Sequence, residues 1–552
     1  MTLLSIKNLE THLRVGKKQI IKAVDDISLE IESAETYCLV GESGSGKSIC
    51  ALSIIQLLPA GISSHPDGEI LFNWQKDQDT QTQVNMLELE DTALRQIRGS
   101  RIAMIFQEPM TSLNPVLNIG EQIVEALQLH HPNMSDGEAR DQAITAMKQV
   151  QIKNSEGRFN DFPHQLSGGQ RQRVMIAMAL ACKPDLLIAD EPTTALDVTV
   201  QAEILRLMKK LQKDTGMSIL FITHDFGVVA QMAHKVGVMQ QGKLVEQGVM
   251  KEVLTNPQHP YTKKLLAAVP DNLERPKIIQ AENSISDDSQ VLVDIKDLKV
   301  WFPIKTGLFR RVTDHVRAVD NVDLQIHKGK IVALVGESGC GKTTLGRAII
   351  QLEEATEGSI KLSGEELIGL TAKQLRPIRS RMQIAFQDPQ SSLNPRLQIV
   401  TTLTEPMEVH NIGENKEDRI ERAANILEEV QLERDFLWRY PHEFSGGQRQ
   451  RIGLARALVV KPEFIVCDEI TSALDVSVQA EILQLLLEIR KKQDLTLLFI
   501  THNIAVVEYL SDETVVMKAG KIVERGLTAD VCGNPQQAYT QKLLAAVPRL
   551  NF

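Results

Sequence analysis

Short runs of apolar, often β-branched residues alternate along this chain with longer helical stretches that carry capping signals. Two such runs, Tyr37–Val40 and Ile331–Val335, stand directly before glycine-rich segments. Strands that alternate with helices are typical of a largely parallel sheet. Residues 116–162 and 396–440 have a mostly helical pattern interrupted by polar turns. The pattern therefore predicts an α/β protein with a helical subdomain in each half.

The chain repeats itself. The segment GESGSGKS (41–48) recurs as GESGCGKT (336–343), and PHQLSGGQRQR (163–173) recurs as PHEFSGGQRQR (441–451). Further segments recur in the same order, including the tails that contain YTKKLLAAVP and YTQKLLAAVP. Self-similarity of this extent indicates a duplicated unit. The first half carries about 15 extra residues, which fall in a polar stretch near 73–85.

We therefore predict two domains, 1–270 and 291–552. The segment between them, 271–290, is polar and acidic and has no apolar period. Such composition is typical of a linker without a packed core, and we expect a flexible tether.

Composition narrows the class of function. A net charge of −10 and an aromatic content of 4% disfavour nucleic-acid binding, which needs cationic side chains on the phosphates and aromatic rings that stack on the bases. No nucleic-acid partner is therefore expected. The longest apolar run, nine residues at 174–182, is about half of what a spanning helix needs, and no secretory signal is found at the N-terminus. The six cysteines lie far apart, which is typical of reduced structural thiols.

Each half contains the pattern G-x-x-x-x-G-K-[ST] directly after an apolar strand run, the context of a phosphate-binding loop. Its backbone N–H groups and the following helix start can surround phosphate oxygens. The lysines are expected to contact the β- and γ-phosphates and the hydroxyls to bind Mg²⁺. The ATP-binding residues predicted here are Gly41, Ser43, Gly44, Ser45, Gly46, Lys47 and Ser48, and Gly336, Ser338, Gly339, Cys340, Gly341, Lys342, Thr343 and Thr344.

Paired acids follow a buried strand in each half. Asp190 and Asp468 are expected to help coordinate the metal ion. The next residues, Glu191 and Glu469, are expected to act as general bases on the attacking water. An acidic pair alone is usually a solvated strand end, and only its position after the phosphate loops gives it this interpretation.

The segment SGGQ opens a predicted helix in each half, with a serine that can cap it and two glycines that permit close backbone approach. A helix start of this kind is an anion site. Each half then has two such starts, one more than a single nucleotide needs. The residues concerned are Ser167, Gly168, Gly169 and Gln170, and Ser445, Gly446, Gly447 and Gln448.

The order phosphate loop, FQ, LSGGQ, DE, ALD and TH resembles that of ATP-binding-cassette (ABC) ATPases, over essentially the whole chain and twice. The resemblance implies two tandem P-loop cassettes, each a RecA-like core with a helical subdomain. It also implies that the cassettes pair within the chain, so that each ATP lies between one phosphate loop and the other SGGQ signature. By this resemblance Gln107 and Gln387 belong to the loop that senses Mg²⁺ and water. Asp197 and Asp475 belong to the D-loop, which crosses between cassettes. His224 and His502 contact the γ-phosphate.

More narrowly, GESGSGKS, FQEPMTSLNP and the tails resemble the oligopeptide, dipeptide and nickel import branch, above all its fused two-cassette subunits for glutathione and microcin C. This implies an ATPase on the cytoplasmic face of the inner membrane, peripheral through two integral-membrane permease subunits that dock near 108–115 and 388–395. It further implies an extracytoplasmic solute-binding protein and peptide-like cargo. Some relatives carry an iron–sulfur cluster in the tail; the tails here hold only Cys532, so none is expected.

Two positions depart from the first-half pattern. Ile470 replaces the proline at 192, and Asn503 replaces the aspartate at 225. Neither removes a group assigned to chemistry, so both sites are expected to hydrolyse ATP. The adenine-stacking aromatic is expected at Phe302 or Trp301, whereas the first half has Leu13 and His12 there.

A rival interpretation is a twin-cassette ATPase that acts on ribosomes. Proteins of that class usually have a longer, strongly charged helical linker and a different D-loop sequence. The weakly patterned linker of about 20 residues and the sequence ALDV in both loops favour the importer.

Overall fold

The computed structural model describes residues 1–16, 19–59, 61–77, 80–107, 112–194, 196–275, 290–306, 311–388, 392–472 and 474–550. The chain divides into two compact units. The first comprises Met1–Leu196, Val200–Ala267 and Pro548–Phe552, and the second comprises Asp197–Thr199 and Ala268–Val547. Most of the predicted linker, at 276–289, and part of each predicted permease-docking segment, at 108–111 and 389–391, lie outside the described residues.

A six-stranded sheet forms the centre of the first unit, and its order is β11-β10-β3-β9-β8-β7. Every pairing is parallel except that of the edge strand β11. Strands β3, β8 and β9 are buried at every residue, as expected for parallel strands covered on both faces. The strands are β3 (Thr36–Val40), β7 (Ile102–Ile105), β8 (Leu186–Asp190), β9 (Ser218–Thr223), β10 (Lys235–Gln240) and β11 (Lys243–Val249).

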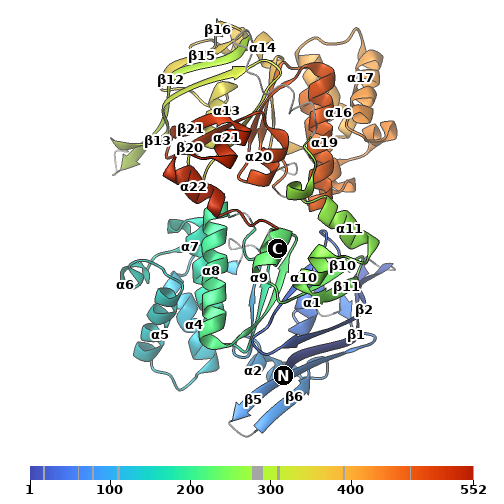
Figure 1. Ribbon diagram of the computed structural model, residues 1–552, viewed down its shortest axis with the longest axis vertical. Helices are drawn as coiled ribbons and strands as arrows, with labels where there is room; N and C mark the ends of the chain where they lie inside the picture. The colour runs from blue at the N-terminus through green and yellow to red at the C-terminus, as the bar shows by residue number, and fades with distance from the viewer. Residues whose placement is uncertain are drawn as a thin grey trace. The chain divides into compact units, whose positions relative to one another are not determined.

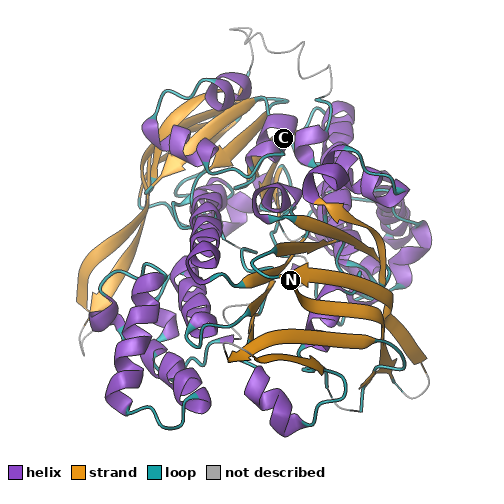
Figure 2. Ribbon diagram, turned by 60° about the horizontal axis from the view of Figure 1, so that its bottom comes forward, coloured by secondary structure: helices purple, strands orange, loops and turns teal. Residues whose placement is uncertain are grey.

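A second, antiparallel sheet of order β2-β1-β5-β6, with the short β4 beside β1, was not predicted from the sequence. Its long strands lie near the N-terminus in Figure 2. The polar insertion near 73–85 falls in the hairpin of β5 and β6, where the second unit has a much shorter hairpin. The strands are β1 (Thr2–Val15), β2 (Gln19–Glu32), β4 (Ser63–Ser64), β5 (Glu69–Asp77) and β6 (Thr80–Asn85).

Helix α1 (Lys47–Ile54) contacts both sheets of the first unit. Its buried residues Ile54 and Cys50 join one core with Phe72 of the antiparallel sheet and Leu39 of the parallel sheet. Burial of a side chain the size of leucine or phenylalanine contributes roughly 1.5–3 kcal/mol, so this core fixes the helix firmly. The start of α1 is thereby held at the carboxyl end of β3, where the phosphate loop was predicted.

The predicted helical subdomain is present in the first unit. Helices α4, α5 and α7 pack on one another, away from the antiparallel sheet (Figure 1). The helices and 3-10 turns of this unit are α2 (Asp91–Ile97), α4 (Ile119–His130), α5 (Asp136–Gln149), α6 (Ser155–Arg158), η1 (Pro163–Gln165), α7 (Gly168–Leu180), α8 (Val198–Thr215), α9 (Phe226–Met232), α10 (Met250–Thr255) and α11 (Pro260–Ala267).

The second unit repeats this architecture. Its central sheet has the order β17-β18-β19-β14-β20-β21, and its antiparallel sheet has the order β13-β12-β15-β16. The strands are β12 (Val291–Thr306), β13 (Arg311–His327), β14 (Ile331–Val335), β15 (Glu357–Leu362), β16 (Glu365–Glu366), β17 (Met382–Ala385), β18 (Phe464–Asp468), β19 (Thr496–Ile500), β20 (Glu513–Lys518) and β21 (Lys521–Leu527).

The helices of the second unit occupy corresponding places, with α16 and α17 in its helical subdomain (Figure 1). They are α13 (Lys342–Ile349), α14 (Ala372–Arg379), α16 (Ile399–Val409), α17 (Lys416–Glu429), η3 (Arg434–Trp438), η4 (Pro441–Glu443), α18 (Gly446–Leu458), α19 (Val476–Gln493), α20 (Ile504–Leu510), α21 (Thr528–Gly533) and α22 (Ala538–Ala545). Among the described residues, no helix combines the length and apolar character needed to span a bilayer.

The start of the predicted linker is ordered against the second unit. Residues Pro270–Asn272 form the 3-10 turn η2, which contacts α20. Arg275 then donates a hydrogen bond of 2.7 Å to the carbonyl of Ser511. Residues 270–275, at the start of the predicted linker, are therefore held by contacts within the second unit.

Candidate nucleotide site

Each predicted phosphate loop joins a buried strand to a helix start. Gly46 caps α1 with φ 104°, and Gly341 caps α13 with φ 108°. A Cβ atom at Gly46 would collide with the carbonyl of Ala23, and one at Gly341 with the carbonyl of Ala318. Only glycine fits a left-handed position with backbone this close. The loop backbone is therefore drawn tightly to the helix start, where N–H groups can receive an anion.

The lysines of both loops fold back onto loop carbonyls. Lys47 Nζ donates to the carbonyls of Gly41 at 2.7 Å and Glu42 at 2.8 Å. Lys342 Nζ donates to those of Gly336 at 2.8 Å and Glu337 at 2.9 Å. Both lysines are almost fully buried, so these acceptors compensate the loss of water around an ammonium. The same carbonyls keep each ammonium inside its loop.

The other predicted loop residues surround the lysines. The Oγ of Ser45 lies 3.4 Å from Lys47 Nζ, and the Sγ of Cys340 lies 3.9 Å from Lys342 Nζ. Four loop residues are exposed, and the hydroxyl residues after the lysines lie in the first turn of α1 and α13. The exposed residues are Ser43, Gly44, Ser338 and Gly339, and the half-buried Ser48 and Thr343 follow the lysines, with Thr344 next in the second loop.

The loop hydroxyls contact the first acid of each pair. Ser48 Oγ donates to Asp190 Oδ1 at 3.1 Å, and Thr343 Oγ1 donates to Asp468 Oδ1 at 3.1 Å. Burial raises the pKa of both carboxyls above the ordinary aspartate value, although the hydroxyls oppose that rise. A hydroxyl and a carboxylate are oxygen ligands of the kind that Mg²⁺ uses together with substrate phosphates. Among the described residues, no group of three or more His, Cys, Asp or Glu side chains forms a metal site by itself.

The second acid of each pair is the centre of a polar cluster. Glu191 Oε2 accepts from Gln107 Nε2 at 2.9 Å, and its Oε1 lies 3.1 Å from His224 Nδ1. In the second unit Glu469 accepts from Gln387 Nε2 at 2.8 Å and lies 3.4 Å from His502 Nδ1. Glutamine, glutamate and histidine, assigned separately from the sequence, thus form one bonded group in each unit.

Both glutamates have a strained backbone. Glu191 has φ 46° and Glu469 has φ 48°, in the left-handed region that residues other than glycine seldom adopt. Their N–H groups donate to Ile222 and Ile500 of the neighbouring strand at 3.0 and 2.9 Å. Such strain costs roughly 1–3 kcal/mol and persists at functional sites where surrounding contacts impose it. With this backbone, each carboxylate contacts the glutamine and histidine of its own unit.

The two glutamates are not held identically. Thr194 Oγ1 donates to Glu191 Oε2 at 2.9 Å, whereas the corresponding Ser472 Oγ donates to the backbone carbonyl of Glu469 at 2.9 Å. Burial alone would raise the pKa of Glu191, but His224, Thr194 and the Lys47 ammonium together lower it to about 2. The pKa of Glu469 is also lowered, against burial, by His502 and Lys342. Both carboxylates are therefore ionised at neutral pH.

The SGGQ segments form capped helix starts. Ser167 caps α7, receiving the Gln170 N–H at 3.4 Å, and Gln170 Oε1 in turn accepts the Ser167 N–H at 3.0 Å. Ser445 and Gln448 repeat both bonds at the start of α18. A Cβ at the second glycine, Gly169 or Gly447, would press into a valine of the following helix, while Gly168 and Gly446 face almost open space. Among the described residues, no signature side chain bonds to the carboxylate cluster of its own unit.

The D-loop aspartates precede the next long helices. Asp197 stands directly before α8, and Asp475 is the N-terminal cap residue of α19. Both are half-buried.

The two candidate adenine-stacking aromatics differ in availability. The Arg317 guanidinium lies 4.7 Å from the centre of the Trp301 ring, so one face of that ring is covered. The neighbouring Phe302 is 40% exposed. In the first unit Leu13 and His12 occupy the matching positions of β1, and both are half-buried. Phe302 is thus the more exposed of the two aromatics.

The two departures from the repeat preserve local structure. Asp225 accepts the N–H groups of Gly227 and Val228 and so caps α9, and Asn503 caps α20 with the corresponding bonds. An asparagine side-chain oxygen serves this role as well as an aspartate does. Ile470 is buried in the core.

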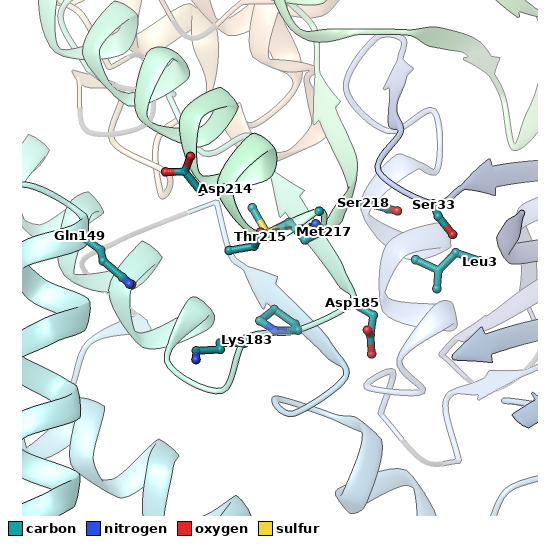
Figure 3. Close-up of a pocket in the computed structure, with 11 residues that line it drawn as sticks. Leu3, Ser33, Gln149, Lys183, Asp185, Asp214, Thr215, Met217 and Ser218 are labelled. Atoms are coloured by element: carbon teal, nitrogen blue, oxygen red, sulfur yellow. Dashed lines mark hydrogen bonds between the residues drawn. The ribbon is translucent and has the colours of Figure 1, made fainter. Parts of the chain in front are cut away.

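A hollow in the first unit lies at the other end of the parallel sheet (Figure 3). Lys183 and Asp185 line it just before β8, and Thr215 and Met217 line it just before β9. It contains none of the predicted nucleotide-binding residues.

Some contacts of the site have no direct counterpart in the sequence analysis. The hydroxyl of Thr194 on Glu191 was not anticipated, although the repeat shows threonine and serine at equivalent positions. The tail tyrosines Tyr261 and Tyr539, which belong to the repeat and to the tails that resemble the import branch, reach the phosphate loops at Glu42 and Glu337. Neither contact follows from spacing, because it depends on how distant segments fold together.

Comparison with known proteins gives two family matches. The ABC transporter profile matches residues 24–194 and 319–472, and the profile named oligopeptide/dipeptide transporter, C-terminal region, matches 245–289 and 523–552. The chain is 50% identical to the peptidoglycan transport ATP-binding protein YejF of Agrobacterium fabrum, over 99% of this chain and 96% of that protein. It is 46% identical to the glutathione import ATP-binding protein GsiA of Salmonella paratyphi A, over 96% of this chain and 87% of that protein. It is 45% identical to an uncharacterized ABC transporter ATP-binding protein YejF of Escherichia coli K12, over 99% of both chains.

Proposed function

Because this chain belongs to the ABC transporter family, we propose that it is the ATP-hydrolysing subunit of an importer for peptide-like solutes. Hydrolysis at two sites drives passage of the solute through separate membrane subunits. The candidate cargoes are dipeptides, oligopeptides, glutathione and microcin C-like peptides.

One observation supports peptide-like solutes as the cargo. Both tails match the C-terminal region of oligopeptide and dipeptide transporters, at 245–289 and 523–552. The names of the relatives, which include glutathione import and peptidoglycan transport proteins, point to the same class of solute. All of these solutes contain peptide bonds or peptide-like linkages.

The proposed roles follow the contacts in each unit. An incoming phosphate offers Lys47 and Lys342 stronger acceptors than the loop carbonyls that they contact at 2.7 to 2.9 Å. In the first unit the Ser48 hydroxyl and the Asp190 carboxylate would hold Mg²⁺, and in the second unit Thr343 and Asp468 would do so. The ion would neutralise charge at the β- and γ-phosphates.

The glutamates act on water. Glu191 and Glu469 are ionised and lie at the carboxyl end of a buried strand, as a general base requires. Gln107 and Gln387 orient the carboxylate and the attacking water, and the histidines contact the γ-phosphate. His224 contributes more than Thr194 or Lys47 to the lowered pKa of Glu191, so loss of the bond to His224 would raise that pKa and strengthen the base.

We also propose that the two cassettes pair to complete both sites. The phosphate loop 41–48 is completed by Ser445–Gln448, and the loop 336–343 by Ser167–Gln170. The open space above Gly168 and Gly446 at two capped helix starts supports this arrangement, because a phosphate could approach the backbone there. Asp197 and Asp475 then lie at the junction between cassettes.

The partners proposed are two integral-membrane permease subunits, which hold the chain at the cytoplasmic face of the inner membrane, and an extracytoplasmic solute-binding protein. Reconstitution tests this directly. The chain, co-purified with its membrane subunits and inserted into liposomes with ATP inside, should support ATP-dependent uptake of labelled glutathione or of a di- or tripeptide presented by the binding protein. The double variant Glu191→Gln/Glu469→Gln serves as the matched control and should take up none. Co-sedimentation with ribosomes and no association with membrane subunits would contradict the proposal.

A further inference from the structure

We propose that Tyr261 and Tyr539, one in each tail, are positioning residues that hold the phosphate loops in the shape that binds ATP. The inference rests on the proposed function, because it assigns a role in nucleotide binding to the tail segments. Both tyrosines lie within the regions matched by the transporter tail profile.

The tyrosine hydroxyl reaches the phosphate loop in both units. Tyr261 Oη accepts the backbone N–H of Glu42 at 3.4 Å and donates to Glu42 Oε2 at 3.1 Å. In the second unit Tyr539 Oη accepts the N–H of Glu337 at 3.2 Å. The two loops are about 220 and 200 residues away in sequence from their tyrosines, so the contact is formed by folding and not by local chain geometry.

The tyrosine and the loop lysine hold the same peptide group. The carbonyl of Gly41 accepts from Lys47, and the N–H of the same peptide unit, that of Glu42, donates to Tyr261. The carbonyl of Gly336 and the N–H of Glu337 are held in the same way by Lys342 and Tyr539. When the lysine moves to a phosphate oxygen, the tyrosine keeps its contact to that peptide.

A hydrogen-bonded turn before α11 positions this hydroxyl in the first unit. In the first unit Glu246 of β11 accepts the N–H groups of Gln258 and His259 at 2.6 and 3.1 Å, which fixes the turn before α11. Amide donors lower the pKa of Glu246 even though burial opposes them, so the carboxylate that fixes the turn is ionised. Tyr261 sits in the first turn of α11 and is 8% exposed.

The second tail repeats the construction. Glu524 of β21 accepts the N–H groups of Gln536 and Gln537 at 2.7 and 3.2 Å. The Lys518 ammonium lies 4.8 Å from the centre of the Tyr539 ring, a favourable cation–π distance. Burial raises the pKa of the Tyr539 hydroxyl to about 12, so it is protonated at neutral pH. The two tails, whose turns read NPQH (256–259) and NPQQ (534–537), thus place the same group on the same loop atom.

The test uses the full chain with one site disabled. In a Lys342→Ala background, the affinity of the first site for ATP with Mg²⁺ is measured by the ATP-induced rise in melting temperature and by equilibrium binding of labelled ATP. Tyr261→Phe keeps the ring and removes only the hydroxyl. We expect Kd to rise about 3- to 10-fold, because both hydrogen bonds between the hydroxyl and Glu42 are lost, with kcat at saturating ATP nearly unchanged.

Tyr37→Phe is the matched control. Tyr37 is buried in β3, and its hydroxyl donates to Gln247 of β11 at 3.1 Å, so it stands near the same tail without touching the phosphate loop. Its Kd should stay within about twofold of the parent. The reciprocal experiment places Tyr539→Phe in a Lys47→Ala background and should weaken the second site alone.

An unchanged Kd in Tyr261→Phe, or an equal rise in Tyr37→Phe, would overturn the inference and leave the proposed function standing. A parent chain that binds ATP but hydrolyses none with its membrane subunits would instead refute the proposed function. In that case the Kd comparison still decides the role of the tyrosines.

Discussion

The side-chain amide of Gln107 donates a hydrogen bond of 2.9 Å to the carboxylate of Glu191. Gln387 and Glu469 repeat this bond at 2.8 Å. The glutamine follows β7 and the glutamate follows β8, so the pair joins the loop toward the helical subdomain to the proposed general base. A movement of that loop would act directly on the group that activates water.

Replacing Gln107 by glutamate should move the acid limb of the pH–rate profile to higher pH. A second carboxylate at this distance disfavours ionisation of both groups, which raises their pKa values as a pair. The measurement is steady-state ATP hydrolysis against pH in a Glu469→Gln background, so that the first site alone reports. Gln107→Ala, which introduces no charge, should slow hydrolysis without that shift. A profile for Gln107→Glu that coincides with that of Gln107→Ala would disprove the electrostatic link.

The hydroxyl of Thr194 should matter more than that of Ser472. Thr194 bonds to the carboxylate of Glu191, whereas Ser472 bonds to a backbone carbonyl. Thr194→Val removes the hydroxyl at nearly constant volume and should reduce turnover at the first site about 3- to 10-fold. Ser472→Ala should change turnover at the second site by less than about twofold. Single-site turnover is measured with the other glutamate changed to glutamine, and equal losses at both sites would refute the difference.

Removal of the Ser48 hydroxyl should weaken the dependence of ATP binding on Mg²⁺. Ser48→Ala removes one of two proposed oxygen ligands, so the Mg²⁺ concentration for half-maximal ATP binding should rise by about tenfold. Ser48→Thr is the control, because Thr343 already occupies this position in the second unit with the same 3.1 Å bond to its aspartate. If Ser48→Ala and Ser48→Thr required the same Mg²⁺ concentration, the hydroxyl would not be a ligand.

The stability contributed by Glu191 should disappear in acid. Its folded-state pKa, about 2, lies below the ordinary value of 4.5, so the ionised form stabilises the fold above about pH 4.5 and that stabilisation is lost as the pH falls toward 2. The difference in melting temperature between the unmodified chain and Glu191→Gln should therefore shift against the unmodified chain on acidification through this window. A difference independent of pH there would mean that the folded pKa is not lowered.

Much of the architecture could be predicted from the sequence. The strand runs before the glycine motifs, the helical segments at 116–162 and 396–440 and the duplication all correspond to elements of the structure. These features are local, since they depend on residue pattern within one segment. The α/β class and the two-cassette organisation follow from them.

The antiparallel sheet and the finer geometry of the site could not be predicted in this way. Strand β1 carries no clear alternation, and its partners lie up to about 70 residues away, at β5. Glu191, with its left-handed backbone, bonds to Ile222, Gln107 and His224, which come from two other segments, the one after β7 and the end of β9. Likewise, the bond from the Glu42 N–H to Tyr261 joins residues that only the tertiary fold brings together.

The most direct test of the account is ATP hydrolysis by the chain assembled with its membrane subunits, measured for the unmodified protein, Glu191→Gln, Glu469→Gln and the double variant. A missing general base reduces the chemical step by roughly 10²- to 10⁴-fold. We predict that each single variant loses a substantial part of the rate and that the double variant retains almost none. A single variant that hydrolyses ATP at the rate of the unmodified protein would contradict the claim that both cassettes are active.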